Sequence, residues 1–380
     1  MIIGMKLTLQ TQLLPTQEQV LALEETMRAF NAAADWLAGE AFHRKTANKI
    51  LLQKLYYATL RERFGLSAQM AVRCIAQVCE AYKRDKTKRP HFRPFASIPY
   101  DQRLMSFKGL DRVSLLTLSG RIIVPVIMGK YQKERFTNAK GQCDLVRRED
   151  GKWFLLVTVD LPDGTKPPTT DFIGVDLGVA NLATDSDGQR YSGNAVEAVR
   201  VRQHALRRSL QKAAAGKKRR GLRPKNIRRK LKRLSGKERR FRANENHRIA
   251  KSLVAKAKGT GRGIALEDLK GIRNRTRFRK AQRARMGGWA FAQLRAFVEY
   301  KASLAGVEVV YINPAYTSQT CAVCGHVSKA NRPSQAEFRC VVCGHTDHAD
   351  VNAARNISCL ARASVNTPKV SEPHQDLLFA

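Results

Sequence analysis

The chain has 380 residues, enough for two or three domains with cores of their own, and its 43% hydrophobic residues exclude a disordered polypeptide. Its 69 Lys and Arg residues against 32 Asp and Glu residues give a net charge of +37, which opposes a compact fold unless a polyanion such as nucleic acid is bound. No apolar run approaches the roughly 18 residues of a membrane span, and the N-terminus lacks a signal-peptide core, so we expect a cytoplasmic protein without a membrane partner.

The first 165 residues are predicted to form a small β-barrel interrupted by helices. Residues 6–10 alternate like a strand, and Thr16 with Gln19 three positions later has the pattern of a capping box. Apolar residues then recur at helical spacing to about residue 86, and the polar face of these helices either grips a nucleic-acid duplex or is simply solvated. From about residue 90 the period changes to two, which predicts strands at 113–118, 121–127 and 153–159. A Pro-, Gly- and Thr-rich stretch at 162–170 is the expected linker to the next domain.

A strand with a carboxylate inside it follows this linker. Residues 172–181 read Phe-Ile-Gly-Val-Asp-Leu-Gly-Val-Ala-Asn, a β-branched and aromatic run with Asp176 near its middle. If the strand is buried, Asp176 must be paired or must hold a cation, because an isolated ionised carboxylate in an apolar setting is very costly. On this stretch alone, an acid on the solvent face of a hairpin that turns at Asp187-Gly188 is an equally good interpretation.

The most basic part of the chain comes next. Residues 201–250 contain 20 Lys and Arg residues and only two acids, with Leu, Ile and Ala interspersed, which predicts long helices. A basic cluster is often merely a solvated face, but this density favours a surface that tracks phosphates. The candidate nucleic-acid contacts are Lys217, Lys218, Arg219, Arg220, Arg228, Arg229, Lys230, Lys232 and Arg233, followed further along the chain by Arg273, Arg275 and Arg277.

Two more acids lie beside apolar runs. Residues 263–269 form a strand-like run that contains Glu267, and Asp350 lies at the expected N-terminus of the last helix. Carboxylates that share one cleft repel each other unless divalent cations neutralise them, and hard oxygen ligands favour Mg²⁺ or Mn²⁺. Two such ions about 3.5–4 Å apart would support phosphodiester hydrolysis. Convergence of Asp176, Glu267 and Asp350 is a hypothesis here, and the alternatives that spacing leaves open are Asp185, Asp187, Asp268 and Asp347.

Four cysteines form a separate metal motif. Cys321 and Cys324 form one C-x₂-C pair, Cys340 and Cys343 form another, and 15 residues separate the pairs. A glycine follows each pair and permits a tight turn that presents backbone amides to the thiolates. Four thiolates in two such knuckles are typical of a closed, structural, tetrahedral Zn²⁺ site, which has no open position for catalysis.

In sequence order, these motifs resemble the transposon-encoded TnpB proteins, which are RNA-guided DNA endonucleases ancestral to the type V CRISPR effectors. The resemblance extends over nearly the whole chain and is most specific in the last two hundred residues. It rests on Gly174-Val-Asp176-Leu-Gly178, Leu266-Glu267-Asp-Leu269, Asn313-Pro-Ala-Tyr-Thr-Ser-Gln-Thr-Cys321 with the cysteine motif, and Asp350-Val-Asn352-Ala-Ala-Arg-Asn356.

The resemblance implies an α/β multidomain fold. It implies an RNase H-like RuvC nuclease domain with a zinc-ribbon insertion, plus an N-terminal wedge β-barrel with a helical recognition insert. The implied domains are the first strand of the wedge barrel (1–15), the helical recognition domain (16–89), the wedge β-barrel (90–165), the RuvC domain with its basic helices (166–312), the zinc-ribbon insert that binds target nucleic acid (313–347), the C-terminal part of RuvC (348–363) and a disordered tail (364–380).

The resemblance also implies a function. It places Asp176, Glu267 and Asp350 at the catalytic positions of a Mg²⁺- or Mn²⁺-dependent endodeoxyribonuclease, with Asp347 either assisting or replacing Asp350. The expected partners are a guide RNA transcribed from the transposon end and double-stranded target DNA, with no small-molecule substrate, in the nucleoid of a prokaryotic cell. The rival hypotheses are a guide-independent RNase H-like transposase or resolvase and a nuclease-inactive nucleic-acid-binding regulator.

Overall fold

The computed structural model describes residues 5–136, 139–162, 164–268 and 291–366. The chain divides into two compact units, Met1–Pro162 and Asp163–Ala380, each with its own sheet. No helix in the described part of the chain combines the length and the apolar character needed to cross a membrane.

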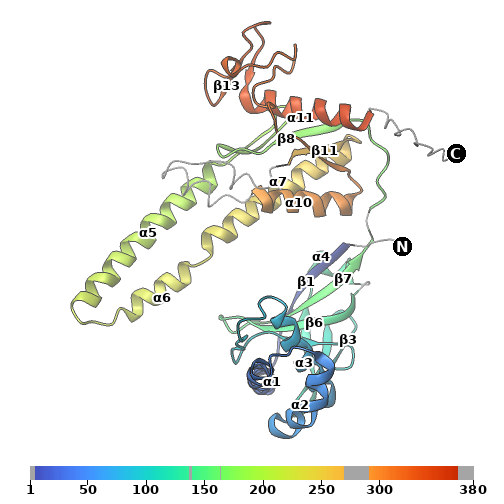
Figure 1. Cartoon of the computed structure of the whole chain (residues 1–380), viewed down its shortest axis with the longest axis vertical. Coiled ribbons are helices and arrows are strands. Elements are labelled where there is room, and N and C mark those ends of the chain that lie inside the picture. Colours follow the sequence, from blue (N-terminus) through green and yellow to red (C-terminus); the bar gives the residue numbers. More distant parts are fainter. Residues whose placement is uncertain (1–4, 137–138, 163, 269–290, 367–380) are drawn as a thin grey trace, which may run out of the picture. The chain divides into compact units, whose positions relative to one another are not determined.

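The first unit is built around a seven-stranded antiparallel sheet (Figure 1). Its strands are β1 (Met5–Leu13), β2 (Ile98–Tyr100), β3 (Met105–Lys108), β4 (Arg112–Thr117), β5 (Gly120–Ile127), β6 (Ala139–Arg147) and β7 (Trp153–Leu161), and the short helix α4 (Lys130–Lys133) follows β5. The strand order is β2-β6-β7-β1-β5-β4-β3, so the start of the chain supplies the central strand. The sheet is nearly closed, and the Tyr100 hydroxyl of β2 donates to the Leu116 carbonyl of β4 at 2.8 Å.

Three helices lie between β1 and β2 in the sequence: α1 (Gln17–His43), α2 (Lys49–Phe64) and α3 (Ala68–Tyr82). Each begins where a polar side chain accepts hydrogen bonds from the first free backbone amides. The predicted capping box of α1 is present, because Thr16 Oγ1 accepts from Gln19 N at 3.3 Å and Gln19 Oε1 accepts from Thr16 N at 3.1 Å. At α2 the Asn48 side chain accepts from the Ile50 and Leu51 amides, and at α3 the Ser67 side chain accepts from the Met70 amide.

The second unit contains a five-stranded mixed sheet in the order β10-β9-β8-β11-β12. Its strands are β8 (Phe172–Asp176), β9 (Asn181–Asp185), β10 (Arg190–Ser192), β11 (Gly263–Glu267) and β12 (Val309–Ile312). The first three strands form an antiparallel meander, whereas β8, β11 and β12 are parallel. Parallel neighbours need crossover connections. The helices α5 (Asn194–Arg219), α6 (Lys225–Leu234) and α7 (Lys237–Gly259) lie between β10 and β11, and α10 (Phe291–Ala305) precedes β12.

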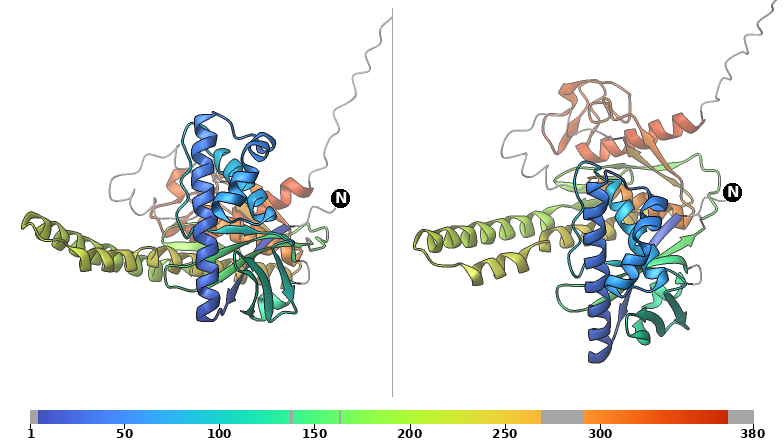
Figure 2. Two further views of the ribbon diagram at one scale, coloured as in Figure 1. Left: turned by 90° about the horizontal axis from the view of Figure 1, so that it is seen from below. Right: turned by 60° about the horizontal axis from the view of Figure 1, so that its bottom comes forward.

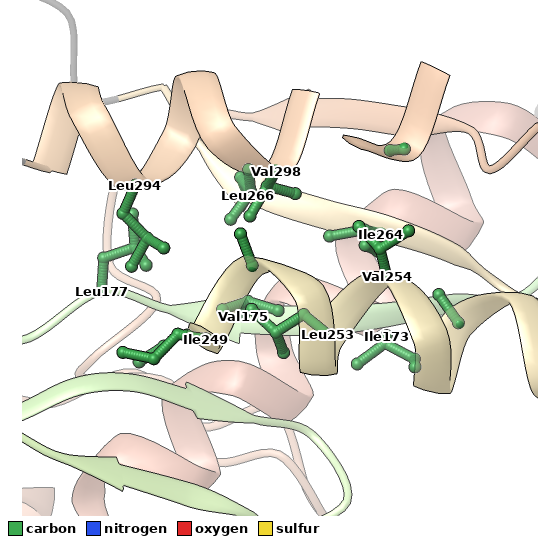
Figure 3. Packing of buried hydrophobic residues seen from close by; sticks show 14 of the residues in the cluster. Ile173, Val175, Leu177, Ile249, Leu253, Val254, Ile264, Leu266, Leu294 and Val298 are labelled. Carbon is green, nitrogen blue, oxygen red and sulfur yellow. The ribbon is translucent and has the colours of Figure 1, made fainter. Parts of the chain in front are cut away.

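Helices cover both faces of this sheet. Figure 3 shows Leu253 and Val254 of α7 and Leu294 and Val298 of α10 packed around apolar side chains of β8 and β11. On the other face, α11 (Ala349–Asn366) buries Ile357 and Ala361 against Phe172, Ala265 and Ile312. The ends of β8 and β11 are therefore enclosed between two helical layers.

Gly174 of β8 allows α11 to lie unusually close to the sheet. A Cβ atom at this position would lie 2.0 Å from the Ala354 carbonyl oxygen and 2.5 Å from the Ser358 amide nitrogen, both backbone atoms of α11. Ser358 Oγ in turn donates to the Phe172 carbonyl at 2.6 Å. The glycine in the Gly-Val-Asp motif is thus required by helix packing.

The helices α5 and α6 lie side by side as a hairpin that extends away from the sheet of the second unit (Figures 1 and 2). The chain turns at Gly221 between them and at Gly236 before α7, with φ angles of 70° and 78° that favour glycine. We call residues 194–234 the basic arm. Long helices were predicted in this region, and the structure contains them.

One predicted boundary is wrong. Residues 364–366 were assigned to the disordered tail, but they form the last turn of α11, where Ser364 Oγ donates to the Ala361 carbonyl at 2.8 Å. The sequence places Thr367 directly before Pro368, and a residue in that position disfavours the helical conformation. The rest of the predicted tail, residues 367–380, lies outside the described residues.

Candidate functional site

Two of the predicted acids end neighbouring parallel strands. β8 ends at Asp176 and β11 ends at Glu267, and the strands pair with Val175 opposite Leu266. Parallel strands in this register place both carboxylates at the same edge of the sheet. Because Val175 and Leu266 belong to the core under α7 and α10, the alternation of side chains turns Asp176 and Glu267 toward the α11 face.

The third acid, Asp350, lies in the first turn of α11. Asn181 Nδ2 donates to Asp350 Oδ2 at 2.9 Å, and a guanidinium nitrogen of Arg332 lies 3.6 Å from Asp350 Oδ1. Burial, together with the negative charges of Glu267 and Asp350, raises the pKa of Asp176 to about 7, and the nearby Arg332 opposes this rise. The structure therefore brings the three predicted acids together at one edge of the sheet, close enough to interact electrostatically.

Glu267 is held by a side chain from the loop after β12. Thr317 Oγ1 donates to Glu267 Oε1 at 2.5 Å, and the threonine is only 4% exposed. Burial raises the pKa of Glu267, and this hydrogen bond opposes the rise. Neither Asp176 nor Glu267 forms an ion pair with any residue that the structure describes. Two poorly solvated carboxylates that form no ion pair within the described part of the chain are chemically suited to bind a divalent cation.

The four alternative acids, by contrast, each have a cationic partner. The shortest ion pairs are Asp185 with Lys256 at 2.7 Å, Asp187 with Arg262 at 2.6 Å, Asp268 with Arg295 at 2.9 Å and Asp347 with Arg355 at 2.6 Å. Asp347 also belongs to the hairpin of β13 (Glu337–Arg339) and β14 (Thr346–His348), where it pairs with Phe338. Their positive partners satisfy these carboxylates within the fold, so they are weaker metal-ligand candidates than Asp176 and Glu267.

The four predicted cysteines form one cluster. Their sulfur atoms all lie within 4.8 Å of one another, with Cys321 Sγ 3.7 Å from Cys343 Sγ and Cys324 Sγ 3.6 Å from Cys340 Sγ. Among the described residues, this is the only group of three or more possible ligand side chains whose ligand atoms are that close. Backbone amides of Cys343 and Val342 lower the pKa of the Cys340 thiol to about 6, which favours the thiolate. The cluster can hold a structural metal ion.

The predicted nucleic-acid contacts are exposed where the structure describes them. Lys217, Lys218, Arg219 and Arg220 lie at the end of α5 and just beyond it, and Arg228, Arg229, Lys230, Lys232 and Arg233 lie on α6. The helix α6 contains no acid, and its half-buried Ile227, Leu231 and Leu234 recur at helical spacing. Arg273, Arg275 and Arg277 lie outside the described residues.

Several polar residues around the carboxylates were not predicted individually. Asn181 and Arg332 contact Asp350, Thr317 contacts Glu267, and two asparagines of α11 hold the loop that carries Thr317. The sequence motifs at 172–181, 313–321 and 350–356 contain part of this set, because each motif includes polar residues near a metal ligand or a candidate acid. No periodicity or spacing assigns these side chains a partner.

Comparison with known proteins agrees with this architecture. Residues 155–272 match the OrfB_IS605 family, described as "Probable transposase", and residues 291–357 match the family described as "Cas12f1-like, TNB domain". A solved structure of the mini-RNA-guided endonuclease CRISPR-Cas_phi3 aligns with a TM-score of 0.55 at 11% identity, over 95% of this chain and 93% of that one. This likeness shows a shared fold.

Two curated relatives are similar in sequence. The CRISPR-associated endodeoxyribonuclease Cas12f1 of Syntrophomonas palmitatica is 34% identical over 61% of this chain and 48% of its own length. The chain spans about half the length of the two Cas12f1 relatives it matches. "Putative RNA-guided DNA endonuclease InsQ" of Escherichia coli (strain K12) is 32% identical over 301 residues, which cover 74% of this chain and 72% of InsQ. Because this likeness extends over most of both proteins and is accompanied by the predicted motifs, the chain belongs to the TnpB family.

Proposed function

We propose that the chain is an RNA-guided DNA endonuclease that hydrolyses phosphodiester bonds. Its catalytic residues would be Asp176, Glu267 and Asp350. The observation that carries the proposal is the meeting of these three acids at one sheet edge, with Asp176 and Glu267 lacking any ion-pair partner in the described part of the chain. Family membership and the names of the relatives support the choice of nucleic acid as substrate.

The carboxylates would hold two Mg²⁺ or Mn²⁺ ions. When bound, such a pair activates a water molecule as the nucleophile and stabilises the oxygen that leaves the phosphorus. The three acids would not all need to bind the same ion, so they can be more widely spaced than the four cysteines. Asn181 would fix the orientation of Asp350, and Arg332 would offset part of the negative charge.

The cysteine cluster fits structural Zn²⁺. With a Zn–S distance of about 2.3 Å, a tetrahedral site has sulfur atoms about 3.8 Å apart. The two measured S···S distances, 3.7 and 3.6 Å, are close to that value. We assign residues 313–347 as the zinc ribbon that binds target nucleic acid, inserted in an RNase H-like RuvC domain of residues 166–312 and 348–366.

The remaining parts would hold nucleic acid. The basic arm presents nine of the twelve predicted cationic contacts on exposed positions and can follow the backbone of an A-form duplex without reading bases. The first unit would act as wedge barrel and recognition helices. Sequence specificity would reside in the guide RNA, as in other RNA-guided nucleases.

A cleavage assay with matched variants tests the proposal. The full chain, purified with its RNA, should cut target duplex in the presence of Mg²⁺ and not after chelation, whereas Asp176→Ala should abolish cutting and leave DNA binding within a few-fold of wild type. Asp347→Ala serves as the control for the alternative acid and should retain most of the activity. A wild-type complex that binds DNA but never cuts it favours the regulator hypothesis, and activity with random RNA fragments favours a guide-independent transposase.

A further inference from the structure

A short segment joins the two candidate metal sites. Residues 313–321, which we call the bridge segment, leave β12 and end at the first cysteine of the cluster. Its Thr317 hydroxyl lies 2.5 Å from Glu267 Oε1 and 3.2 Å from the Pro314 carbonyl, so the shorter contact identifies the carboxylate as the main acceptor. The segment therefore touches one site through Thr317 and belongs to the other through Cys321.

The helix α11 holds the bridge segment in place through hydrogen bonds from two asparagine side chains. Asn356 Nδ2 donates to the carbonyls of Thr317 at 2.8 Å and Thr320 at 2.7 Å. Asn352 Nδ2 donates to the same Thr320 carbonyl at 2.8 Å, and Asn352 Oδ1 accepts from the Ala322 amide, inside the first cysteine pair, at 3.0 Å. Both asparagines are buried, with 0% and 6% exposure for Asn352 and Asn356. Asn352 is two residues from Asp350, so α11 both carries the Asp350 carboxylate and holds the loop between Cys321 and Cys324 in place.

The backbone of the bridge segment is held in an unusual conformation. Tyr316 has a φ angle of 63°, one of two positive values among the described non-glycine residues. A left-handed conformation is unfavourable at a bulky residue and persists only where its surroundings impose it. Here the Tyr316 carbonyl accepts from the Gln319 amide at 2.9 Å and from both the amide and the hydroxyl of Thr320, at 3.0 and 2.9 Å. The strained turn immediately precedes Thr317.

We propose that the bridge segment couples the two metal sites, and that Thr317 is the positioning residue that transmits the state of the cysteine-bound metal to Glu267. The inference rests on the proposed function, because it concerns the same carboxylate site. By donating to Oε1, Thr317 restrains the orientation of the Glu267 carboxylate and would leave Oε2 available to a divalent cation. Loss of the metal from the cysteine cluster would break the hydrogen bond between Asn352 and the Ala322 amide. The bridge segment would then become more mobile, and Thr317 would no longer hold the Glu267 carboxylate in one orientation.

The test measures metal affinity on the full zinc-loaded chain freed of nucleic acid. Thr317→Val keeps the shape of the side chain but removes the hydroxyl, and we expect it to weaken Mn²⁺ binding about 10- to 100-fold, the usual effect of losing a hydrogen-bond partner of a metal ligand. Calorimetry or Mn²⁺ electron paramagnetic resonance provides the affinity, and elemental analysis should show unchanged zinc. Thr317→Ser should restore wild-type affinity. Thr346→Val, the same exchange at an exposed position of the β13–β14 hairpin, should leave the Mn²⁺ affinity unchanged.

A second variant tests the coupling itself. Cys340→Ser should lower the zinc content and, if the bridge segment transmits the loss, should also weaken Mn²⁺ binding in the folded chain. The inference is overturned if Thr317→Val binds Mn²⁺ with wild-type affinity. It is also overturned if Cys340→Ser loses zinc, keeps its second unit folded and still binds Mn²⁺ with wild-type affinity. Either result leaves the proposed function intact. Failure of the proposed function has a different signature: the wild-type chain would then show no Mn²⁺ site that Asp176→Asn removes.

Discussion

At the scale of single residues, the defining feature of the carboxylate site is that its acids lie where water solvates their negative charge poorly. Asp176 follows four buried residues of β8, and its own burial is the largest cause of its raised pKa. In the absence of a cation, the fold therefore disfavours the ionised form that would bind one. A carboxylate whose pKa is raised in this way by burial and by neighbouring charges is a candidate for a functional site.

Asp176→Asn should stabilise the metal-free chain in a pH-dependent way. The folded-state pKa of about 7 lies above the ordinary value near 3.9, so the unfolded chain ionises first and the wild type loses stability as the pH rises from about 4 to about 7. We expect the variant to gain little at pH 4.5 and up to about 4 kcal/mol at pH 8, since about three pKa units separate the two states. Urea unfolding at both pH values measures the gain.

Mg²⁺ supplies the control for this experiment. Saturating Mg²⁺ should raise the stability of the wild type at pH 8 and have little effect on Asp176→Asn, because binding to the folded state alone stabilises it. An equal gain at pH 4.5 and pH 8 would mean that the substitution acts through packing and not through the charge of Asp176.

The sequence allowed the charged residues of the site to be predicted far better than their neutral partners. Asp176 and Glu267 stand out because an acid inside or at the end of an apolar run contradicts its surroundings. Thr317, Asn352 and Asn356 are ordinary polar residues, and their roles depend on contacts with residues 30 to 50 positions away. Such contacts exist only after the fold has formed, so neither spacing nor composition reveals them.

At the scale of elements, the packing of α11 on β8 decides where Asp350 lies. Gly174→Ala places a methyl group against backbone atoms of α11, at 2.0 Å from one and 2.5 Å from another, and a helix backbone cannot yield as a flexible side chain would. We expect a loss of at least 1–3 kcal/mol in stability, typical of overpacking, together with a loss of cleavage, because α11 carries Asp350 away from Asp176. Thermal unfolding and the cleavage assay measure the two effects.

The matched control for this prediction is another glycine to alanine exchange in the same unit. Gly216 lies within α5, and an added Cβ would meet nothing within 4 Å. Gly216→Ala should be neutral or slightly stabilising, since alanine is the better helix former. If Gly174→Ala were as stable and as active as Gly216→Ala, the close approach of α11 to β8 would not be what positions Asp350.

Elements with a strong local pattern could be predicted, whereas short strands could not. The capping box of α1 and the apolar runs of β8 and β11 carry their own signal. β2 and β3 are only three and four residues long, too short for an alternating pattern to emerge. They form because longer neighbours pair with them, β6 with β2 and β4 with β3, so tertiary structure decides their conformation.

At the scale of the whole molecule, a net charge of +37 opposes a compact state through self-repulsion, and the basic arm carries a large share of the surplus. Its two helices bury little apolar surface, with Val196 and Gln203 the buried residues of α5 and none in α6. An arm of this kind contributes little to a core. Phosphate contacts would explain why it is retained.

Reversing three charges on α6 should separate phosphate binding from a solvated surface. With Arg228, Arg229 and Lys230 all changed to Glu, we expect weaker RNA binding. The slope of log K against log salt concentration should decrease in magnitude by about 2, because each lost phosphate contact reduces this slope by about 0.7–0.9. Filter binding at several salt concentrations measures the slope. The control reverses Lys83, Lys88 and Arg112, each already paired with a nearby acid, and changes the net charge equally. If both triple variants lowered the slope equally, α6 would contribute no more to RNA binding than these ion-paired residues of the first unit do.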